Sequence, residues 1–545
     1  MTLFTKKGHW LLPGLFMLIT FFANLDALPT DIMESRNIVT GREMVSDGNW
    51  LVPTMNGELR LEKPPLPTWI SGIVESIVPN SLTAQRVPAA MMGCLWTIYL
   101  LLLARIVARR DDYAITAAMV FLTCYNLILM GRSATWDIYC HAFMMAAIYY
   151  LTRTLFENRH SLRRFVLAGA LMGLSFLSKG PVAFYALLLP YLVALATVLR
   201  PKMSGKWAGV ALMILVMTAV GAWWYVYLWG LHPIEASQVF HKETSSWADH
   251  NTRPWYYYWR FFLEMGVWAV LVPGALAVGY WRRRVTLKRE YVFTLTWTVA
   301  CLVLLSLIPE KKTRYLLPLL APCSMLVATI LIHFRMTKTK PVGFAKWLWR
   351  INGWTTATVV AAIPVLGYYF GIRKGIVGWT AETLMTLVAL SALAAIIRAT
   401  RRRQPLLYVG AVTTVFAGIE LFMLPAVGNA FGNPQGRSIH RLADRTELKG
   451  LPFYHSDSQP IRIELVYEVG RKILPLNLHD ERLVMSRLPM VIVTQGYARE
   501  ELPAALIEKT DTVSYGYFDD NKRPKGYKHY NKAFLNYVTL VKNKK

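Results

Sequence analysis

Long apolar runs recur along the first 426 residues, separated by short polar stretches. A helix crosses a bilayer core about 30 Å thick with roughly 20 apolar residues. About thirteen runs approach this length. Their approximate bounds are 9–27, 86–108, 112–131, 136–156, 164–178, 181–199, 207–231, 259–281, 290–308, 315–334, 351–371, 378–397 and 405–426. The sequence therefore predicts a polytopic α-helical membrane protein with about thirteen transmembrane helices.

The composition excludes several classes of protein. Charged residues make up 17% of the chain and apolar residues 54%, whereas an ordinary globular protein has about a quarter charged residues. A soluble enzyme, a disordered chain and a fibrous protein are excluded. The net charge of +27 would suit a nucleic-acid partner, but basic loops that orient membrane helices explain it better. The five cysteines fall within apolar runs and lack metal-ligand spacing.

The basic residues indicate how the helices are oriented. Short loops rich in Lys and Arg stay on the cytoplasmic side of a membrane. Alternate connections carry most of these residues, near positions 6–7, 109–110, 159–164, 200–206, 282–289, 335–340 and 398–403. We therefore expect a cytoplasmic N-terminus. The first run could instead be a cleaved signal peptide, because Lys6 and Lys7 precede it.

The opposite set of connections carries few basic residues, and the positive-inside rule does not account for them. They are Lys63, Arg132, Lys179, Lys311, Lys312 and Arg314. Charged groups at a membrane boundary that orientation does not explain are candidates for function.

The chain changes character after the last apolar run. Residues 428–545 alternate short β-type and helical patterns, so we expect a soluble α/β domain outside the cytoplasm. Its expected strands are Leu451–His455, Ile473–Leu476, Pro489–Thr494 and Leu535–Val541, and its expected helices are Arg462–Arg471 and Arg499–Lys509. Residues 1–427 then form the transmembrane domain, which includes an amphipathic outer loop over 28–66.

This outer loop holds the first candidate site residues. Asp31 and Glu34 are three apart, so on a helix they share a face and could act as paired carboxylates. A solvated amphipathic face is the simpler alternative. The loop closes with Glu62-Lys63-Pro64-Pro65, in which the prolines stiffen the turn. Lys63 could bind a lipid phosphate, or simply extend its ammonium group to the interface.

Three further candidates lie on the same predicted face. Asp137 begins a predicted helix, where it could also serve as a cap. Lys179 stands in the turn Ser178-Lys179-Gly180-Pro181, and turn chemistry does not explain its charge. Lys311, Lys312 and Arg314 concentrate positive charge before Tyr315, which a bound anion explains better than a solvated charge run.

The loop between the runs 207–231 and 259–281, residues 232–258, is rich in aromatic residues. Its side chains His241, Glu243, Asp249 and His250 could ligate a metal, but they lack a tight motif spacing. An interfacial aromatic loop is the favoured interpretation.

The sequence contains no glycine-rich phosphate loop and no large cytoplasmic domain of the nucleotide-sugar type. If the protein transfers a group, the donor should therefore be carried by a lipid and approached from the outer leaflet.

Taken in order, several motifs resemble a known family. They are Gly41-Arg42-Glu43-Met44, Gly48-Asn49-Trp50, Glu62-Lys63-Pro64-Pro65, Ser178-Lys179-Gly180-Pro181, Pro254-Trp255-Tyr256-Tyr257 and Pro309-Glu310-Lys311-Lys312. Over residues 10–425 the chain resembles the bacterial aminoarabinose transferases of lipid A modification and the related protein O-mannosyltransferases. The resemblance implies a GT-C glycosyltransferase of the bacterial inner membrane, which takes a sugar from a polyprenyl phosphate in the periplasmic leaflet. Lipid A, a glycan or a protein would be the acceptor.

The resemblance also implies roles for particular residues. The family's catalytic Asp falls on Met33, so Glu34 or Asp31 would take its place, with Asp137 as the second acidic position. Lys63, Lys311, Lys312, Arg314 and Tyr315 would contact the lipid phosphate, and Glu62 with His250 could hold a divalent metal. The alternative from another class is a non-catalytic protein that binds or transports polyprenyl phosphate.

Overall fold

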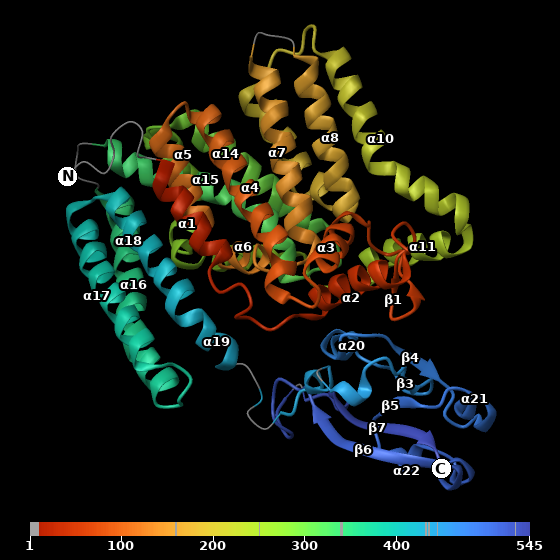
Figure 1. Cartoon of the computed structure of the whole chain (residues 1–545). Coiled ribbons are helices and arrows are strands. Elements are labelled where there is room, and N and C mark those ends of the chain that lie inside the picture. Colours follow the sequence, from red (N-terminus) through yellow and green to blue (C-terminus); the bar gives the residue numbers. More distant parts are fainter. Residues whose placement is uncertain are drawn as a thin grey trace. The chain divides into compact units, whose positions relative to one another are not determined.

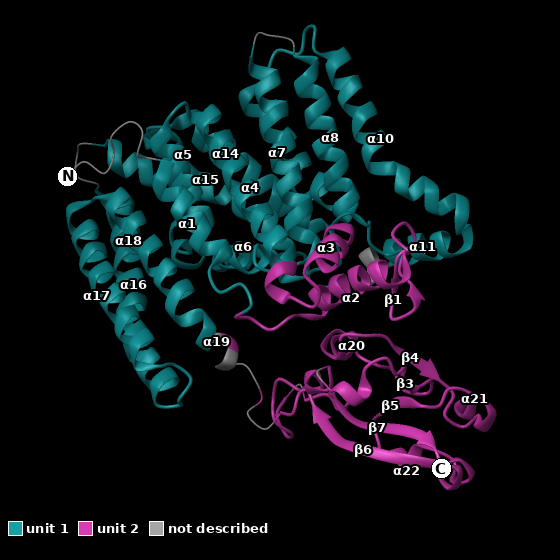
Figure 2. Ribbon diagram, viewed as in Figure 1, with its two compact units in different colours: residues 1–26, 61–67, 86–426 teal, residues 27–60, 68–85, 427–545 magenta. Residues whose placement is uncertain are grey.

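The computed structural model describes residues 10–157, 161–249, 251–337, 342–430, 433, 436–443, 445–528 and 530–544. The chain forms two compact units (Figure 2). Unit 1 comprises Met1–Asp26, Leu61–Pro67 and Arg86–Ala426, and unit 2 comprises Ala27–Arg60, Thr68–Gln85 and Val427–Lys545. Most of the predicted outer loop is therefore grouped with the C-terminal residues.

Unit 1 is helical (Figure 1). Its first helices are α1 (Leu11–Phe22), α4 (Leu82–Ala108), α5 (Asp111–Leu122), α6 (Tyr125–Met130), α7 (Trp136–Phe156), α8 (Leu162–Lys179), η2 (Phe184–Leu188), α9 (Leu189–Ala194) and η3 (Leu195–Leu199). The middle of the unit holds α10 (Trp207–Leu231), α11 (Pro233–Asp249), η4 (Trp255–Trp268), α12 (Leu271–Ala275), α13 (Val278–Arg284) and α14 (Lys288–Leu307). Its last helices are η5 (Thr313–Leu319), α15 (Leu320–Met336), α16 (Gly343–Leu366), η6 (Gly367–Ile372), α17 (Trp379–Arg402), α18 (Pro405–Gly418), η7 (Ile419–Met423) and α19 (Leu424–Ala430).

Seven helical segments in the described part of the chain are long and apolar enough to cross a membrane. They are Leu82–Ala108, Trp207–Leu231, Lys288–Leu307, Thr313–Met336, Gly343–Ile372, Trp379–Arg402 and Pro405–Ala426. The protein is thus a membrane protein, as expected, and the number of about thirteen crossings stays a prediction.

Two of the predicted runs are interrupted. The run 112–131 is divided between α5 and α6 at Thr123 and Cys124. The run 259–281 is divided among η4, α12 and α13, and Gly266 lies within η4 at φ 57° and ψ −120°. A side chain is strained at such a positive φ, so glycine permits this break.

Contacts between helix ends bring the predicted cytoplasmic loops together within unit 1. Arg335 at the end of α15 pairs with Asp112 at the start of α5 at 2.5 Å. Arg403, after α17, donates to the carbonyl of Thr337 at 2.6 Å. Side chains thus join three of the basic connections to one another, and their placement on the cytoplasmic side stays a prediction.

Unit 2 contains a five-stranded sheet with the order β4-β3-β5-β7-β6. The strands are β3 (Phe453–Ser456), β4 (Ile473–Leu476), β5 (Met490–Thr494), β6 (Thr510–Asp519) and β7 (Leu535–Asn543). β3 pairs in parallel with β4 and β5, and β7 pairs antiparallel with β5 and β6. Its helices are α20 (Ile463–Val469), α21 (Glu481–Ser486), α22 (Ala498–Glu501) and α23 (Ala504–Lys509). Two apolar clusters bury the faces of the sheet.

The expected strands all form, within two residues at each end. The sequence missed β6, an edge strand of mostly exposed or half-buried residues with an irregularity at Ser514 and Gly516. The expected helix Arg499–Lys509 is wrong as one element, because Pro503 separates α22 from α23. Proline cannot continue a helix from the residue before it without steric conflict.

The outer loop folds as α2 (Ile32–Asp47) and a short hairpin of β1 (Thr54–Met55) and β2 (Glu58–Leu59), followed by α3 (Leu66–Ile77). Gly41 lets α2 approach α3 closely, since a Cβ atom there would lie 2.9 Å from the Gly72 amide nitrogen. The buried Glu43 accepts hydrogen bonds from Thr54 at 2.7 Å and from the Gly57 amide at 3.1 Å. Gly41 and Glu43 of the family-like motif therefore hold this region of unit 2 together.

Candidate functional site

A buried ion pair joins two consecutive helices of unit 1. Asp137 lies in the first turn of α7, and Lys179 is the last residue of α8. Lys179 donates to the Asp137 carboxylate, and their side chains are only 9% and 5% exposed, respectively. The N-cap residue of α7 is Thr135, and Asp137 lies two positions further along the chain. The ion pair with Lys179, rather than helix capping, therefore explains why a carboxylate stands at this position.

Gly180 positions the lysine. It ends α8 at φ 66°, a conformation that favours glycine, and Pro181 follows at once. The turn that the sequence analysis singled out thus ends the helix where Lys179 reaches α7.

The segment after α14 gathers more positive charge around an aromatic ring. The cationic groups of Lys179, Lys312 and Arg314 lie 5.7, 5.7 and 5.8 Å from the centre of the Tyr315 ring. Cations at this range are attracted to the face of an aromatic ring. Arg314 also acts electrostatically on Asp137. Lys179 and Arg314 therefore connect Asp137 to the predicted phosphate-binding segment.

Glu310 orders this segment from within. Its carboxylate accepts from Lys312 Nζ at 2.5 Å and from the Tyr315 hydroxyl at 3.3 Å. Tyr258 fixes the backbone, because its hydroxyl accepts from the Lys312 amide at 3.0 Å and donates to the Lys312 carbonyl at 3.1 Å. Neither Glu310 nor Tyr258 was assigned a role from the sequence.

Lys311 differs from its neighbours. Its ammonium group donates to the carbonyl of Ile308, and burial lowers the pKa of Lys311 from its ordinary value. The structure therefore places two of the predicted phosphate ligands, Lys312 and Arg314, over the ring of a third, Tyr315. Lys311 is instead held by a backbone carbonyl of its own segment.

Lys63 belongs to a second charged group in unit 1. Its ammonium lies 2.9 and 3.1 Å from the two carboxylate oxygens of Glu243 on α11. The neighbouring residues form a reversed pair, in which Lys242 lies 3.3 Å from Glu62. Two adjacent ion pairs thus attach the proline-stiffened turn to α11.

Tyr225 on α10 links the two charged groups. The charge of Glu243 acts on its phenol group. A Cβ atom at Gly180 would lie 3.5 Å from the same hydroxyl. The Lys63–Glu243 pair and the turn that carries Lys179 therefore flank one tyrosine. We define the phosphate cluster as Lys63, Lys179, Lys312, Arg314 and Tyr315 with the Asp137 carboxylate.

Asp31 and Glu34 lie in unit 2. Asp31 is the N-cap of α2, and its side chain accepts from the Glu34 amide at 2.8 Å. Glu34 is 1% exposed. Asp followed by Glu three positions later is typical of a helix start, and this signal could have identified the cap from the sequence.

The proposed metal ligands remain a prediction. Glu62 is paired with Lys242, and His250 lies outside the described residues. Within the described ranges, no group of three or more His, Cys, Asp or Glu side chains could hold a metal ion.

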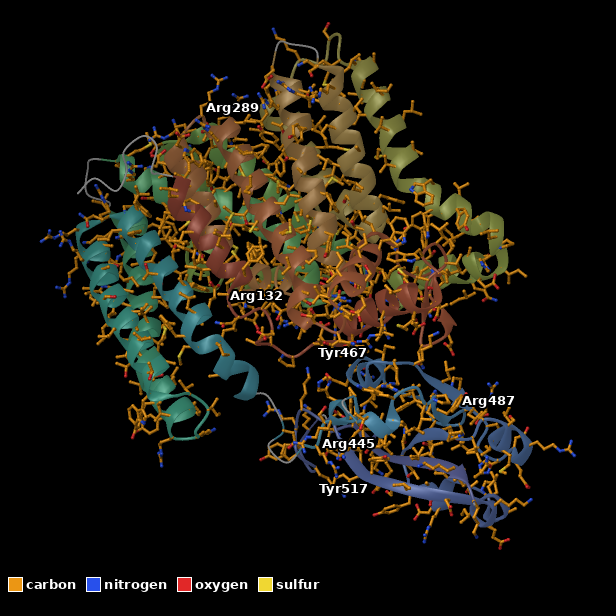
Figure 3. All side chains as sticks on the ribbon, in the orientation of Figure 1. Arg132, Arg289, Arg445, Tyr467, Arg487 and Tyr517 are labelled. Carbon is orange, nitrogen blue, oxygen red and sulfur yellow. The ribbon has the colours of Figure 1, made fainter. Side chains whose placement is uncertain are left out.

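Arg132, a candidate because of its predicted outer position, has a structural role. Arg132, labelled in Figure 3, is 3% exposed. It donates to the carbonyls of Thr20 and Asn24 at 2.6 and 2.7 Å. Carbonyls at the end of a helix lack partners within that helix, and an arginine can satisfy several of them. Arg132 thus terminates α1 in the described structure.

His141 was missed by sequence reasoning. It is buried one helical turn after Asp137, and its ring centre lies 5.3 Å from that of Trp96. The i, i+4 spacing from a candidate acid is the signal that could have found it.

Comparisons with known proteins confirm the resemblance drawn from the motifs. Residues 62–224 match the model of the dolichyl-phosphate-mannose-protein mannosyltransferase family. The chain is 28% identical over 382 residues to undecaprenyl phosphate-alpha-4-amino-4-deoxy-L-arabinose arabinosyl transferase 2 of Proteus mirabilis, which covers 66% of this chain and 65% of that protein. A protein of Yersinia enterocolitica named as the same kind of transferase is 28% identical over 58% of each chain. The chain thus aligns with less than two thirds of the length of these relatives.

Solved structures share the fold. ArnT from Cupriavidus metallidurans, in a crystal structure bound to undecaprenyl phosphate, superposes with a TM-score of 0.70 over 98% of both chains at 16% identity. The same protein in the apo state gives a TM-score of 0.68.

Proposed function

We propose that this membrane protein, similar in sequence to aminoarabinose transferases and alike in fold to ArnT, is a polyprenyl-phosphate-dependent GT-C glycosyltransferase. The observation that carries the proposal is the phosphate cluster. It gathers Lys179, Lys312 and Arg314, from two segments distant in sequence, around one carboxylate and one tyrosine ring. Such a concentration of charge suits an anionic head group.

The donor is a sugar linked to a polyprenyl phosphate, as the names of the relatives indicate for their own substrates. In the reaction, the bond between the anomeric carbon and the phosphate oxygen breaks, and its electron pair leaves with the phosphate. An acceptor oxygen forms the new bond to the same carbon. Negative charge grows on the leaving phosphate, so Lys63, Lys312 and Arg314 stabilise the transition state more than the ground state.

Asp137 is the carboxylate that we assign to the reaction. It lies among the cations of the cluster, whereas Asp31 is engaged as a helix cap. If the acceptor is a hydroxyl group, Asp137 accepts its proton, which requires that Lys179 move its hydrogen bond to the donor phosphate. If the acceptor is a phosphate of lipid A, already ionised, Asp137 orients the cations and no strong base is needed.

The orientation follows the basic loops. The N-terminus faces the cytoplasm, and the phosphate cluster and residues 428–545 face the periplasm of a bacterial inner membrane. The acceptor is lipid A, in keeping with the resemblance to lipid A aminoarabinose transferases.

The test uses full-length protein in proteoliposomes with lipid A and undecaprenyl phosphate carrying radiolabelled 4-amino-4-deoxy-L-arabinose. We expect label in the lipid A fraction, and loss of that label with Asp137→Asn. Glycan and protein fractions are assayed in parallel, because label there would overturn the acceptor assignment. Donor binding without transfer of label to any fraction would overturn the proposal that the protein is an enzyme. It would favour a protein that binds or transports polyprenyl phosphate.

A further inference from the structure

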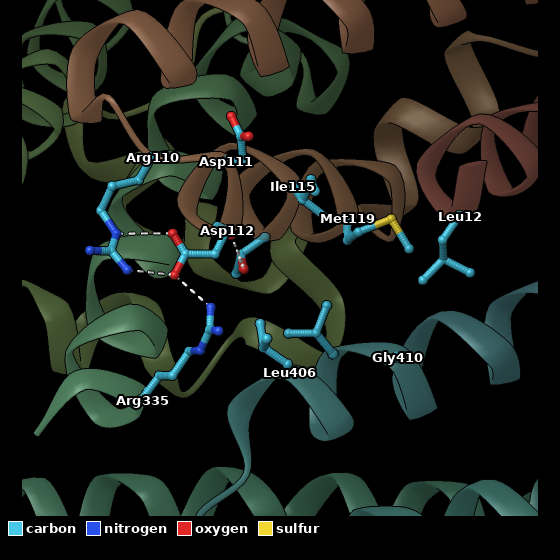
Figure 4. A pocket seen from close by; sticks show the side chains of 11 residues that line it. Leu12, Arg110, Asp111, Asp112, Ile115, Met119, Arg335, Leu406 and Gly410 are labelled. Atoms are coloured by element: carbon cyan, nitrogen blue, oxygen red, sulfur yellow. Dashed lines mark hydrogen bonds and ion pairs between the residues drawn. The ribbon is translucent and has the colours of Figure 1, made fainter. Parts of the chain in front are cut away.

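A cavity of about 400 Å³ lies in unit 1, away from the phosphate cluster. Residues of α1, α5, α15 and α18, together with Arg110 just before α5, line it (Figure 4). Three of these helices contribute residues near one end: α1 and α18 near their starts, and α15 near its finish. The cavity therefore lies where several of the basic connections meet.

The rim of the cavity is charged. Asp112 accepts two hydrogen bonds from Arg110, at 2.9 and 2.8 Å, and lies 2.5 Å from Arg335. The neighbouring Asp111 is paired elsewhere, with Arg105 at 2.7 Å. Two guanidinium groups thus share one carboxylate, and both remain partly exposed, at 37% and 42%. This arrangement leaves one positive charge in excess, which an anion would balance.

The remaining wall is apolar. Leu12, Ile115, Met119, Leu406 and Val409 line the cavity (Figure 4). Gly410 also borders it, and a Cβ atom there would meet no neighbour within 4 Å. A basic rim above an apolar wall matches a molecule with an anionic head and a hydrocarbon chain.

We propose that this cavity binds a glycerophospholipid with an anionic head group. The phosphate lies between Arg110 and Arg335, and one acyl chain begins along the apolar wall. In the orientation proposed above, the basic connections face the cytoplasm, whose leaflet attracts such clusters through its anionic lipids. The inference concerns a lipid other than the sugar donor and does not depend on the transfer reaction.

The test is native mass spectrometry of the full-length protein in detergent, with phosphatidylglycerol, phosphatidylcholine or inorganic phosphate added separately. We expect at least fivefold more phosphatidylglycerol than phosphatidylcholine on the wild type, and no retained inorganic phosphate. Equal retention of both lipids would overturn the anionic preference. Retention of inorganic phosphate at the level of phosphatidylglycerol would overturn the lipid assignment.

Two variants probe the two parts of the cavity independently. Gly410→Phe fills the open space beside the wall, and Arg335→Gln removes one rim charge while Arg110 keeps its partner. Each should lower phosphatidylglycerol retention at least fivefold. Gly279→Phe on α13 is the matched control, since a Cβ atom there also meets open space and the residue does not line the cavity. Unchanged retention in whichever variant remains folded by thermal melting, or an equal loss in the control, would overturn the proposal.

Discussion

Lys179 holds the carboxylate of Asp137 in a buried ion pair that joins the end of α8 to the start of α7. Removing one partner of such a pair leaves an uncompensated charge in a dry site, which is strongly unfavourable. The two residues therefore hold one another in place at the proposed site.

The first prediction concerns Asp137 itself. Asp137→Asn keeps the shape of the side chain but removes the charge that orients Lys179 and Arg314, so transfer should fall by about 100-fold or more, with or without a proton to accept. Sugar transfer to lipid A is the measurement. Glu157→Gln is the control, because Glu157 is a more exposed carboxylate paired with Arg153 and Arg164. Full activity of Asp137→Asn would remove this residue from the mechanism.

Lys63 and Lys242 offer a matched pair of lysines, one on each of two adjacent ion pairs. Lys63→Ala should lower kcat/KM about 100-fold, because the cation acts on the developing phosphate charge. Lys242→Ala should change kcat/KM only a few-fold, since Lys242 is 72% exposed and surface pairs contribute little. Steady-state kinetics with the lipid-linked donor measures both. An equal loss of kcat/KM in the two variants would mean that both lysines only hold the turn in place and that Lys63 has no part in the reaction.

Glu43 should matter for stability rather than for chemistry. Glu43→Ala leaves the hairpin donors of Thr54 and Gly57 without their acceptor, and we expect a loss of about 2–3 kcal/mol in the free energy of unfolding of unit 2. Urea-dependent proteolysis of the full-length protein measures this loss. Asp47→Ala, which removes a partly exposed pair with Lys472, should cost less than about 1 kcal/mol. Similar losses in the two variants would contradict the assignment.

Two helical glycines should respond in opposite directions to alanine. Gly41→Ala places a methyl group 2.8 Å from the Ser71 hydroxyl and 2.9 Å from the Gly72 amide nitrogen, so the protein should be destabilised. Gly14→Ala meets open space in α1 and should be neutral or stabilising, by up to about 1 kcal/mol. Thermal melting in detergent compares them. A stabilised Gly41→Ala variant would disprove the close helix contact.

The stability of unit 2 should depend on pH through Asp520. Burial raises the pKa of Asp520 to about 6, and its side chain accepts from the Ile439 amide at 3.2 Å. An unfolded aspartate titrates near ~3.9, so between these values the folded state binds more protons. The stabilisation is complete below about pH 4 and is lost as the pH rises through about 6, by about 3 kcal/mol in all.

Urea-dependent proteolysis measures the effect at about pH 4.5 and about pH 7.5, which lie below and above the pKa of Asp520 in the folded protein. Asp520→Asn should weaken the pH dependence. Asp511→Asn on the exposed edge strand β6 should keep the wild-type dependence. A wild-type slope in Asp520→Asn would refute the role of this carboxyl group.

Hydrophobic patterning predicted the helical membrane part and four of the five strands of the larger sheet, and its failures have local causes. The strand Ile473–Leu476 forms with the expected bounds. It is a short apolar run between turn signals, and such a run is a clear sequence signal for a strand. The breaks at Cys124 and Gly266 interrupt apolar stretches, and apolarity alone does not distinguish a continuous helix from a broken one. β6 was missed because an edge strand need not alternate strictly.

For the site, the sequence singled out charged residues but not the partners that they contact. The orientation rule selected Lys63, Lys179, Lys312 and Arg314 as charges in need of an explanation. The pairing of Lys63 with Glu243 spans 180 residues, and that of Lys179 with Asp137 spans 42. Only the folded chain brings these partners together, so periodicity and spacing could not supply them.

The bridge between the hairpin and the sheet has a consequence for how the chain threads the bilayer. Asn56 donates to the Ile473 carbonyl at 2.7 Å and accepts from the Ile473 amide at 2.8 Å, which joins two parts of unit 2 that are 417 residues apart. Groups in such contact must occupy the same aqueous compartment. An even number of membrane crossings must therefore separate residue 60 from residue 428, whatever their total, and strand β4 can complete its edge only after the last crossing has been made.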